Sequence, residues 1–335
     1  HKEYRRQRQM CIRDRYKMSI FKLDPAFKDY IWGGTRLRDE YGKKCDYDKV
    51  AESWELSCHK DGPSVVADGE YKGLTLNEYI EKAGKGVLGK NCERFENFPI
   101  LIKLIDAKDN LSVQVHPDND YAMRVEGEYG KTEMWYVVDC DEGATLLYGF
   151  KHEITKEEFA RRIADNTLLE VTNAVPVKKG DVFFIKSGTL HAIGKGILIA
   201  EIQQNSNTTY RIYDYGRVGK DGKPRELHVN KALDVTKLAP AEQYPETPVE
   251  KKDGYDIKLL SKCEYFTTYR VNVETKAELD ADENSFNSIL VLEGEPVISG
   301  GETVSAKKGE SVFISAGTGK YTVEGKCTFV LTKID

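Results

Sequence analysis

The sequence predicts a mainly β protein built from two related β-barrels with short decorating helices. Three observations lead to this prediction: strand-length apolar runs recur between turn residues, helical periodicity is confined to short pieces, and one stretch of sequence is repeated near the C-terminus. The chain has 335 residues, more than twice the roughly 150 of a typical domain. We therefore expect two domains.

The predicted strands are short runs rich in β-branched and aromatic residues, each bounded by Gly, Pro, Asn or Asp. Their number favours antiparallel sheets over a helical bundle. The runs are Pro99–Ile105, Thr132–Val138, Ala144–Tyr148, Val182–Ile185, Ile197–Gln203, Tyr210–Tyr213, Phe266–Val273, Ser288–Leu292, Ser311–Ile314 and Thr328–Thr332.

Helical periodicity predicts three short helices, over Thr75–Ala83, Thr155–Ala164 and Lys231–Thr236. Thr155 is placed to cap the second helix, because acidic residues follow it in the first turn. His228 is expected at the start of the third helix. We interpret His59 and His152 as structural residues.

The stretch LAPAEQYPETPVEKKD contains three prolines and no periodicity, which is typical of a linker. We therefore predict a catalytic domain over residues 18–240, a linker over 241–253 and a second domain over 254–335. The first 17 residues, HKEYRRQRQMCIRDRYK, are basic and have no apolar core of a secretory signal. They are expected to be a non-native or extended N-terminus that precedes a start at Met18.

An internal repeat relates the two predicted barrels. Residues 178–191, KKGDVFFIKSGTLH, align without gaps on residues 307–320, KKGESVFISAGTGK, and seven of the fourteen positions are identical. Each copy has a turn glycine, an apolar run and a second turn glycine. The copies end on different side chains, His191 in the first and Lys320 in the second. The repeat therefore predicts one barrel with a metal-capable residue and one without it.

The charge balance disfavours nucleic-acid and membrane partners. Fifty Lys and Arg residues against 55 Asp and Glu residues give a net charge of −5, with both signs spread along the chain. The longest apolar runs are strand-sized and far shorter than the roughly 20 residues that span a bilayer. Seven scattered cysteines without a CxxC pair are typical of reduced thiols in the cytoplasm. We expect a soluble, cytoplasmic protein whose partner is a small molecule.

The segment from Gly180 to His191 resembles the second motif of the cupin barrel, with Lys186 at a position that is usually proline. A partner motif is expected upstream, and Gln114-x-His116 followed by Glu133 fits it, with Gln114 in place of the usual first histidine. Positions 114 and 116 share one face of a strand, so both side chains can reach one ion inside a barrel.

The donor set of Gln114, His116, Glu133 and His191 offers nitrogen and oxygen but no thiolate. It suits zinc in a catalytic setting, while iron(II), manganese and cobalt remain compatible. A single carboxylate leaves a bound dication with net positive charge, so it stays a good Lewis acid. Each histidine alone also has a structural interpretation. The repeat favours the metal, because Lys320 shows that His191 is not needed for folding.

Six motifs, in the same order, resemble those of type I mannose-6-phosphate isomerase in its short bacterial form. They are Trp32–Leu37 (WGGTRL), Glu52–Ser57 (ESWELS), Leu111–Asp118 (LSVQVHPD), Gly130–Tyr136 (GKTEMWY), Gly188–Ala192 (GTLHA) and Glu201–Arg211 (EIQQNSNTTYR). Together the motifs are specific, although each one alone is weak. The resemblance extends from about Met18 to Asp335.

The resemblance implies a zinc enzyme that interconverts mannose 6-phosphate and fructose 6-phosphate, with one zinc ion per chain. It implies Gln114, His116, Glu133 and His191 as metal ligands, Arg211 and Lys131 as catalytic residues, and Ser112 and Lys103 as substrate-binding residues. The sparse helices agree with the short form, which lacks most of the helical domain of longer members.

Elementary chemistry supports the same residues. Moving a carbonyl between C1 and C2 removes a carbon-bound proton, and the resulting enediolate needs a cation at its oxygens. Arg211, Lys131 and Lys103 can supply positive charge to a phosphorylated sugar in an acidic protein. The alternative for these three residues is a solvated strand edge. The proton-transferring base is left unassigned among Glu133, Lys131, a histidine and a zinc-bound water.

Two other functions remain open at this point. One is a non-catalytic bicupin that binds a sugar, although a structural metal would not need Arg211 and Lys131 beside it. The other is an iron-dependent cupin oxygenase, which Gln114 fits badly because such sites are typically formed by three histidines. Trp32 and Trp54 could line a sugar pocket, but we predict that both belong to the core. The sequence leaves the oligomeric state open.

Overall fold

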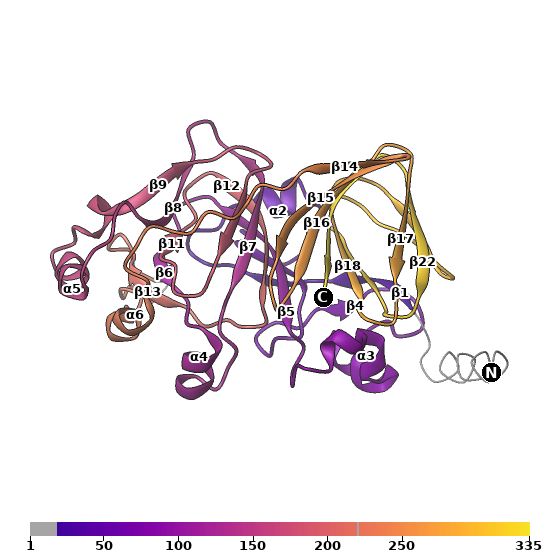
Figure 1. Ribbon diagram of the computed structural model, residues 1–335, viewed down its shortest axis with the longest axis horizontal. Helices are drawn as coiled ribbons and strands as arrows, with labels where there is room; N and C mark the ends of the chain where they lie inside the picture. The colour runs from indigo at the N-terminus through magenta and orange to yellow at the C-terminus, as the bar shows by residue number, and fades with distance from the viewer. Residues whose placement is uncertain (1–18, 220) are drawn as a thin grey trace. The chain divides into compact units, whose positions relative to one another are not determined.

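The computed structural model describes residues 19–219 and 221–335, so the expectations for residues 1–17 and for Met18 lie outside the described residues. The chain is mainly β, as the sequence predicts, with a few short helices (Figure 1). It divides into two compact units. The central unit comprises residues 27–53 and 100–245, and the C-terminal unit comprises residues 54–99 and 246–335 together with residues 19–26.

The central unit contains a six-stranded sheet in the order β10-β7-β12-β5-β3-β2 and a five-stranded sheet in the order β13-β6-β11-β8-β9. Strands β2 and β3 cross the boundary between the two units. The strands of these sheets are β2 (Ala26–Lys28), β3 (Glu52–Leu56), β5 (Ile100–Ala107), β6 (Val113–Val115), β7 (Glu133–Cys140), β8 (Thr145–Phe150), β9 (Thr172–Pro176), β10 (Val182–Ile185), β11 (His191–Ala192), β12 (Ile197–Gln204) and β13 (Tyr210–Tyr213). Its helices are α2 (Arg36–Asp39), α4 (Asn119–Val125), α5 (Lys156–Ala164), α6 (Val229–Val235) and the 3₁₀ turn η3 (Leu168–Glu170).

The C-terminal unit contains an eight-stranded sheet in the order β14-β15-β16-β23-β18-β21-β1-β4 and a four-stranded sheet in the order β17-β22-β19-β20. Its strands are β1 (Ile20–Asp24), β4 (Val65–Val66), β14 (Val249–Lys252), β15 (Tyr255–Lys262), β16 (Thr267–Val273), β17 (Lys276–Ala281), β18 (Asn287–Gly294), β19 (Val297–Ser299), β20 (Thr303–Ser305), β21 (Ser311–Ile314), β22 (Gly319–Glu324) and β23 (Cys327–Lys333). It also holds α3 (Leu76–Ala83), η1 (Lys85–Leu88) and η2 (Lys90–Cys92).

The two units differ from the expected division of the chain. The N-terminal strand β1 pairs with β21, with Ile20 opposite Ile314, so the N-terminal strand belongs to the C-terminal unit. Residues 54–99 join the same unit. Within the stretch expected as a linker, Val249–Lys252 form strand β14 and pair with β15. The roles predicted for the two domains stay predictions.

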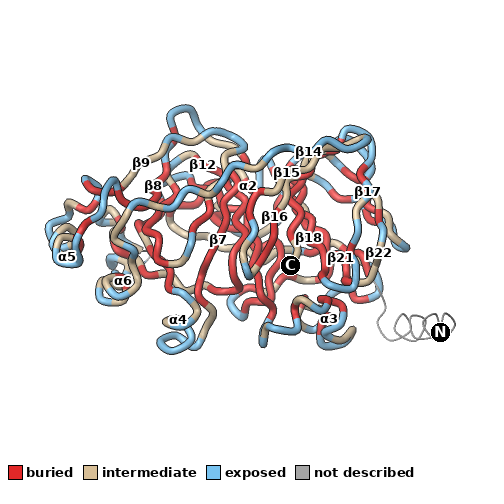
Figure 2. The backbone as a smooth tube through the Cα atoms, viewed as in Figure 1, coloured by how far each residue is buried: buried red, intermediate tan, exposed pale blue. Residues whose placement is uncertain are grey.

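The interior of the central unit changes from apolar to charged along its strands. β5 and β12 are buried at every position and lie side by side at the centre of the six-stranded sheet (Figure 2). Ile105, Val137 and Ile199 pack in an apolar core with residues of the five-stranded sheet. Because side chains alternate, Lys103 and Glu201, two residues away from these isoleucines, face the same interior. The interior is therefore apolar at one end and charged at the other.

The two copies of the repeat form matching strand-turn units. Gly180 and Gly309 both have positive φ, 90° and 87°, a conformation that glycine adopts without strain. The apolar runs that follow form β10 and β21. The copies then diverge, since His191 is fully buried at the start of β11 whereas Lys320 is exposed in β22.

All three predicted helices form, as α3, α5 and α6, and Thr155 caps α5 as predicted. Thr75 and Thr155 each accept a hydrogen bond from the backbone N–H three residues on, and Thr75 forms a full capping box with Glu78. His228 lies at the N-cap of α6, as predicted. Helix α4, which Asp118 caps, lies outside the predicted helices.

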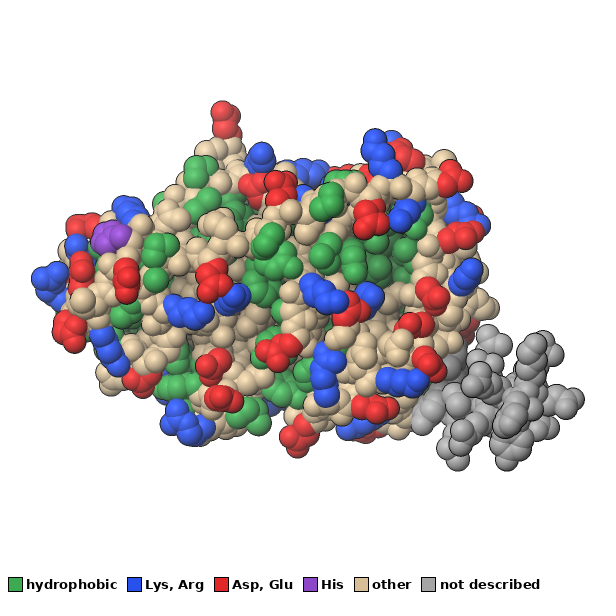
Figure 3. Space-filling model, in the orientation of Figure 1, with side chains coloured by type: hydrophobic (Ala, Val, Ile, Leu, Met, Phe, Trp, Pro, Cys, Tyr) green, Lys and Arg blue, Asp and Glu red, His purple; other side chains and the backbone are tan. Residues whose placement is uncertain are grey.

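Acidic and basic side chains are interspersed on the face of the molecule shown in Figure 3. Within residues 19–219 and 221–335, none of the helices combines the length and the apolar character needed to cross a bilayer.

Candidate metal centre and substrate cavity

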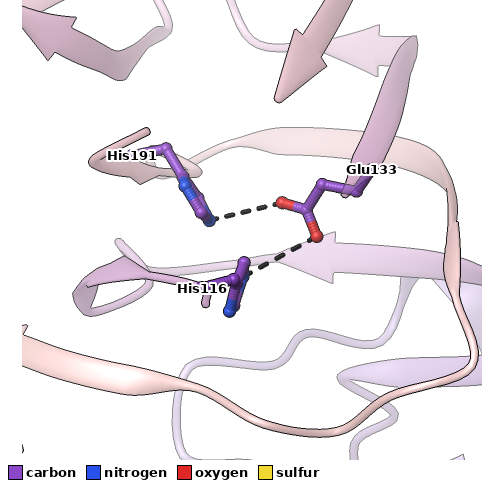
Figure 4. A group of neighbouring side chains, drawn as sticks. All are labelled: His116, Glu133 and His191. Carbon is purple, nitrogen blue, oxygen red and sulfur yellow. Dashed lines mark ion pairs between the residues drawn. The ribbon is translucent and has the colours of Figure 1, made fainter. Parts of the chain in front are cut away.

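His116, Glu133 and His191 meet in the interior of the central unit, and all three are buried (Figure 4). Nε2 of His191 lies 3.3 Å from Oε1 of Glu133, and Nε2 of His116 lies 3.7 Å from Oε2. One ligand atom from each residue lies within 4.8 Å of the others. Two imidazoles and a carboxylate at this spacing could hold one divalent metal ion.

The two sheets bring these residues together. His116 follows β6, His191 begins β11, and Glu133 begins β7 of the facing sheet. The backbone N–H of Gly188 donates to the carbonyl of His116 at 2.8 Å, which joins the two histidine motifs directly. The pairing of Ile185 with Glu133 fixes the second motif against the strand that carries the carboxylate.

Both histidines are held as neutral rings with Nε2 directed at the centre. Nδ1 of His116 lies 2.9 Å from the carbonyl of Thr208, and Nδ1 of His191 lies 2.8 Å from the carbonyl of Thr189. Since a carbonyl only accepts, each Nδ1 carries the proton and each Nε2 keeps its lone pair. Burial lowers the pKa of His191 to about 4, and burial with the nearby Lys131 holds the pKa of His116 well below its usual range.

The polar atoms at the centre lack ordinary partners. Nε2 of His191 and Oε1 of Glu133 have no hydrogen-bond partner among the described residues, although both are buried. Burial and the negative charge of Glu201 raise the pKa of Glu133, even though Nζ of Lys131 lies 2.6 Å from its Oε2. These orphaned donor atoms fit a cation that they could coordinate.

Gln114 lies beside the triad in the strand register. It pairs with His191 of β11 on one side and with Arg211 of β13 on the other. Directly opposed residues of antiparallel strands point to the same face, so these three side chains face the interior together. The structure therefore brings His116, Glu133 and His191 together and sets Gln114 beside them in the strand register.

A row of alternating buried charges leads from the six-stranded sheet to the triad. Nζ of Lys103 lies 3.5 Å from Oε2 of Glu52 and 3.4 Å from Oε1 of Glu201. Nζ of Lys131 lies 3.5 Å from the same oxygen of Glu201 and 3.2 Å from Nε2 of His116. The other Glu201 oxygen accepts a hydrogen bond from the indole N–H of Trp135 at 2.8 Å.

Two members of this row, Lys103 and Glu201, are held in charged form. Burial disfavours charge on Glu201, but Lys131, Lys103 and the bond from Trp135 outweigh it and lower its pKa. Burial likewise opposes the charge on Lys103, but Glu52 and Glu201 outweigh it and raise its pKa. The shifts of Lys103 and Glu201 agree in describing an ion pair inside the protein.

A cavity of about 250 Å³ opens beside this row. Tyr30, Trp32 and Ile105 form part of its apolar wall. Its polar wall includes all the predicted catalytic and substrate-binding residues together with Gln114 and Glu201: Lys103, Ser112, Gln114, Lys131, Glu201 and Arg211. A polar small molecule with negative charge fits such a lining.

Arg211 directs its guanidinium to the cavity wall. Its Nη1 donates to the carbonyl of Glu226 at 3.0 Å, and its buried Nε has no hydrogen-bond partner among the described residues. Arg225 also lines the cavity and is held by the carboxylate of Asp214. Two arginines at one wall give that end of the cavity a positive charge.

Sequence reasoning missed Glu52 and Arg225 and gave Glu201 no defined role. The signal for Glu201 is a carboxylate inside an apolar strand run, where an unpaired charge would be costly. Trp32 and Trp54 are buried, as predicted, although Trp32 also lines the cavity.

The comparisons with known proteins identify the family. Residues 20–143 match the family model described as the catalytic domain of type I phosphomannose isomerase, and residues 256–334 match the cupin domain of mannose-6-phosphate isomerase. A mannose-6-phosphate isomerase of Bacillus subtilis is 39% identical over 312 residues, which are 92% of this chain and 97% of that protein. The chain belongs to the mannose-6-phosphate isomerase family.

Other members of the mannose-6-phosphate isomerase family agree. The isomerase of Streptococcus mutans is 40% identical over 291 residues, which are 85% of this chain and 88% of that protein. A crystal structure of the mannose 6-phosphate isomerase from Bacillus subtilis superposes with a TM-score of 0.88 at 38% identity and covers 94% of this chain and 99% of that chain. The resemblance found in the sequence is confirmed, and the chain is an enzyme of this isomerase family.

Proposed function

We propose that the protein is a zinc-dependent aldose-ketose isomerase that interconverts mannose 6-phosphate and fructose 6-phosphate through an enediol(ate) intermediate. The observation that carries this proposal is the triad of His116, Glu133 and His191 beside a cavity lined by basic side chains. The family supports the same reaction, because relatives at about 40% identity are named for it.

We propose His116, Glu133, His191 and Gln114 as the ligands of one Zn²⁺ ion per chain. Two neutral imidazoles and a carboxylate are typical of catalytic zinc sites, which keep a position open for substrate. When bound, the ion would act as a Lewis acid toward the oxygens of the substrate. A dication at this point would also offset the burial that raises the pKa of Glu133.

We propose Glu201 as the group that carries the proton between C1 and C2. Glu201 lines the cavity; Trp135 fixes one of its oxygens, while Oε1 faces the ammonium groups of Lys103 and Lys131 at 3.4 and 3.5 Å. The carboxylate would take the proton from C2 of the aldose and return it to C1 while the hydroxyl proton of O2 passes to O1, which yields the ketose. Lys131 and Lys103 keep this carboxylate ionised before the transfer.

The remaining roles concern the substrate. Arg211 and Lys131 would stabilise negative charge on the enediolate or hold the phosphate, because a guanidinium stays protonated in a buried site. Ser112 and Lys103, both buried at the cavity, would contact the sugar. The small size of the cavity suits a monosaccharide phosphate as the partner.

We also propose that each unit is a cupin-like jelly-roll barrel, the central unit being catalytic and the C-terminal unit metal-free. The matching strand-turn units of the repeat support this, as does the exposed ammonium of Lys320 at the position of His191. A cytoplasmic location is part of the proposal, supported by the free thiols of the six cysteines in the described residues.

The test is aldose-to-ketose conversion of mannose 6-phosphate before and after chelation. We expect activity in the untreated protein, its loss with a strong chelator and its return when Zn²⁺ is added. Unchanged turnover in metal-free protein would contradict the metal assignment. The absence of conversion in protein that holds one zinc per chain would contradict the reaction.

A further inference from the structure

Glu128 lies in the loop between α4 and β7 and holds a neighbouring segment through one oxygen. Its Oε2 accepts hydrogen bonds from Oγ of Ser206 at 3.2 Å, from the backbone N–H of Asn207 at 3.0 Å and from Oγ1 of Thr208 at 3.0 Å. All three donors belong to residues 205–209, which join β12 to β13 without regular structure. Charge-assisted hydrogen bonds of this kind are stronger than neutral ones.

The segment 205–209 depends on side chains for its shape, because it has no strand partner there. Ser206 is fully buried, and its hydroxyl accepts the backbone N–H of Thr208 at 3.2 Å while it donates to Glu128. The amide of Gln203 donates to the carbonyls of Gln204 and Ser206. The Glu128 carboxylate is therefore the charged anchor of a connected network.

The loop that carries Glu128 is itself firmly placed. The backbone N–H of Gly130 donates to the side chain of Asn119, and that of Lys131 donates to the carbonyl of Pro117. A Cβ at Gly130 would lie 2.4 Å from the backbone of Asp118, so the loop packs closely against the start of α4. The carboxylate can thus impose a position on the segment that it binds.

Residues 205–209 contribute to the site in two ways. The carbonyl of Thr208 accepts Nδ1 of His116 and thereby fixes the ring and tautomer of a proposed metal ligand. Asn207 and Thr209, on either side of it, line the cavity. One carboxylate therefore controls both a ligand of the centre and a wall of the cavity.

We infer that Glu128 is a positioning residue of this isomerase: by fixing residues 206–208 it sets the orientation of His116 and the cavity wall formed by Asn207 and Thr209. The inference rests on the proposed function, since it assumes a metal at His116. Glu128 itself does not line the cavity, so it acts through the segment and not on the substrate.

The first experiment measures the dissociation constant of Zn²⁺ alone by chelator competition, with no substrate present. Glu128→Ala removes the acceptor of three hydrogen bonds. We expect it to weaken zinc binding by about 10- to 100-fold, the usual effect of removing a group that orients a ligating histidine. Glu128→Gln keeps a carbonyl oxygen that can accept, so we expect an intermediate loss. Unfolding in chelator is recorded for each variant to show that it is folded.

The matched control is Glu126→Ala in the same loop. Glu126 accepts from the hydroxyl of Tyr210 at 2.8 Å and from Nζ of Lys231 at 2.6 Å, and neither of these bonds reaches residues 206–208. We expect its zinc affinity to stay within about twofold of wild type. Equal zinc affinities in the Glu128→Ala and Glu126→Ala variants would overturn the inference. If Glu128→Ala does not fold, Glu128→Gln decides: affinity equal to the control overturns it.

The second experiment separates the two contributions at saturating zinc. There we expect kcat on mannose 6-phosphate to recover in Glu128→Ala while KM stays several-fold raised, about threefold or more, because the wall remains displaced. Full recovery of both constants would overturn the role in the cavity wall. A wild-type protein that is inactive or binds no zinc would contradict the proposed function. An active wild type whose Glu128 variants keep the same zinc affinity and KM would contradict this inference alone.

Discussion

The ion pair between Lys103 and Glu201 offers a sharp test of the buried charge row. The two side chains are 4% and 3% exposed, and their charged atoms lie 3.4 Å apart. At an effective dielectric constant of about 20, this separation corresponds to an attraction of about 5 kcal/mol. The desolvation cost of each group cancels in a double-mutant cycle, and because Glu52 and Lys131 also face these two charges, we expect a coupling of about 2–3 kcal/mol.

The perturbation is a double-mutant cycle of Lys103→Met and Glu201→Gln, both close in shape to the residues they replace. Each single change removes one partner of a buried charge and leaves Lys103 with Glu52, or Glu201 with Lys131, so each should destabilise the protein by up to about 3–5 kcal/mol. The double variant removes both charges. It should therefore be less destabilised than the sum of the single variants, by the coupling energy.

The assay is urea unfolding in the presence of a chelator, so that metal binding does not contribute. Trp135 donates to Glu201, so its fluorescence reports on this region. A control cycle on the exposed pair of Lys90 and Glu283, 2.7 Å apart, should give less than about 1 kcal/mol. A buried coupling no larger than that of the control would refute the reasoning, because it would show that water screens the row.

Three further predictions concern the centre and the cavity. Burial lowers the pKa of His191 to about 4 from 6.5, so between these values the folded chain binds fewer protons than the unfolded chain, and the free energy of unfolding in chelator should fall as the pH falls. In urea titrations, His191→Gln should reduce the dependence of the free energy of unfolding on pH by up to about 1.4 kcal/mol per pH unit. The same dependence in the variant and the wild type would contradict this prediction. Arg211→Lys should retain zinc but lower kcat/KM about a hundredfold or more, because the bidentate guanidinium is lost; a change within about twofold would assign Arg211 to structure. Elemental analysis should find one zinc per chain, and two tightly held ions would show that a second site exists.

Local sequence patterns predicted the regular elements well because their signals are local. Thr75 and Thr155 mark helix starts through bonds to residues three positions on, and β10 and β21 follow turn glycines. The same applies to His116 and His191, which stand in short motifs of fixed spacing. A pattern that depends only on neighbours in sequence can be read without knowing the fold.

The division into units could not be predicted in this way. β1 pairs with β21, which lies almost 300 residues later in the sequence. The pattern of residues in Ile20–Asp24 gives no information on which strand will be its partner. The stretch that contains β14 was expected to be a linker because it has three prolines and no periodicity. All four residues of β14, Val249–Lys252, are exposed, so they lack the alternation of a half-buried strand. β11 has only two residues, too few for any periodic signal.

The charge row escaped sequence reasoning for a different reason. Glu201 and Lys103 each stand in a strand that is apolar at most other positions. Taken alone, each residue suggests a solvent-exposed strand edge or an exception to the apolar pattern. Only the register, which sets Glu201 opposite Lys103, shows that they neutralise each other. Buried charges are explained by partners that the fold supplies, and these partners lie on different strands.

The net charge of this buried row supports the proposed metal site. Lys103 and Lys131 balance two of the carboxylates Glu52, Glu201 and Glu133, and the two histidines are neutral. One buried negative charge is left over, and it appears as the raised pKa of Glu133. A bound dication, as proposed above, would convert this deficit into one net positive charge, which would favour an anionic substrate and its enediolate. A structural ion pair network would need no such imbalance, so the surplus carboxylate is what a catalytic metal site in this row requires.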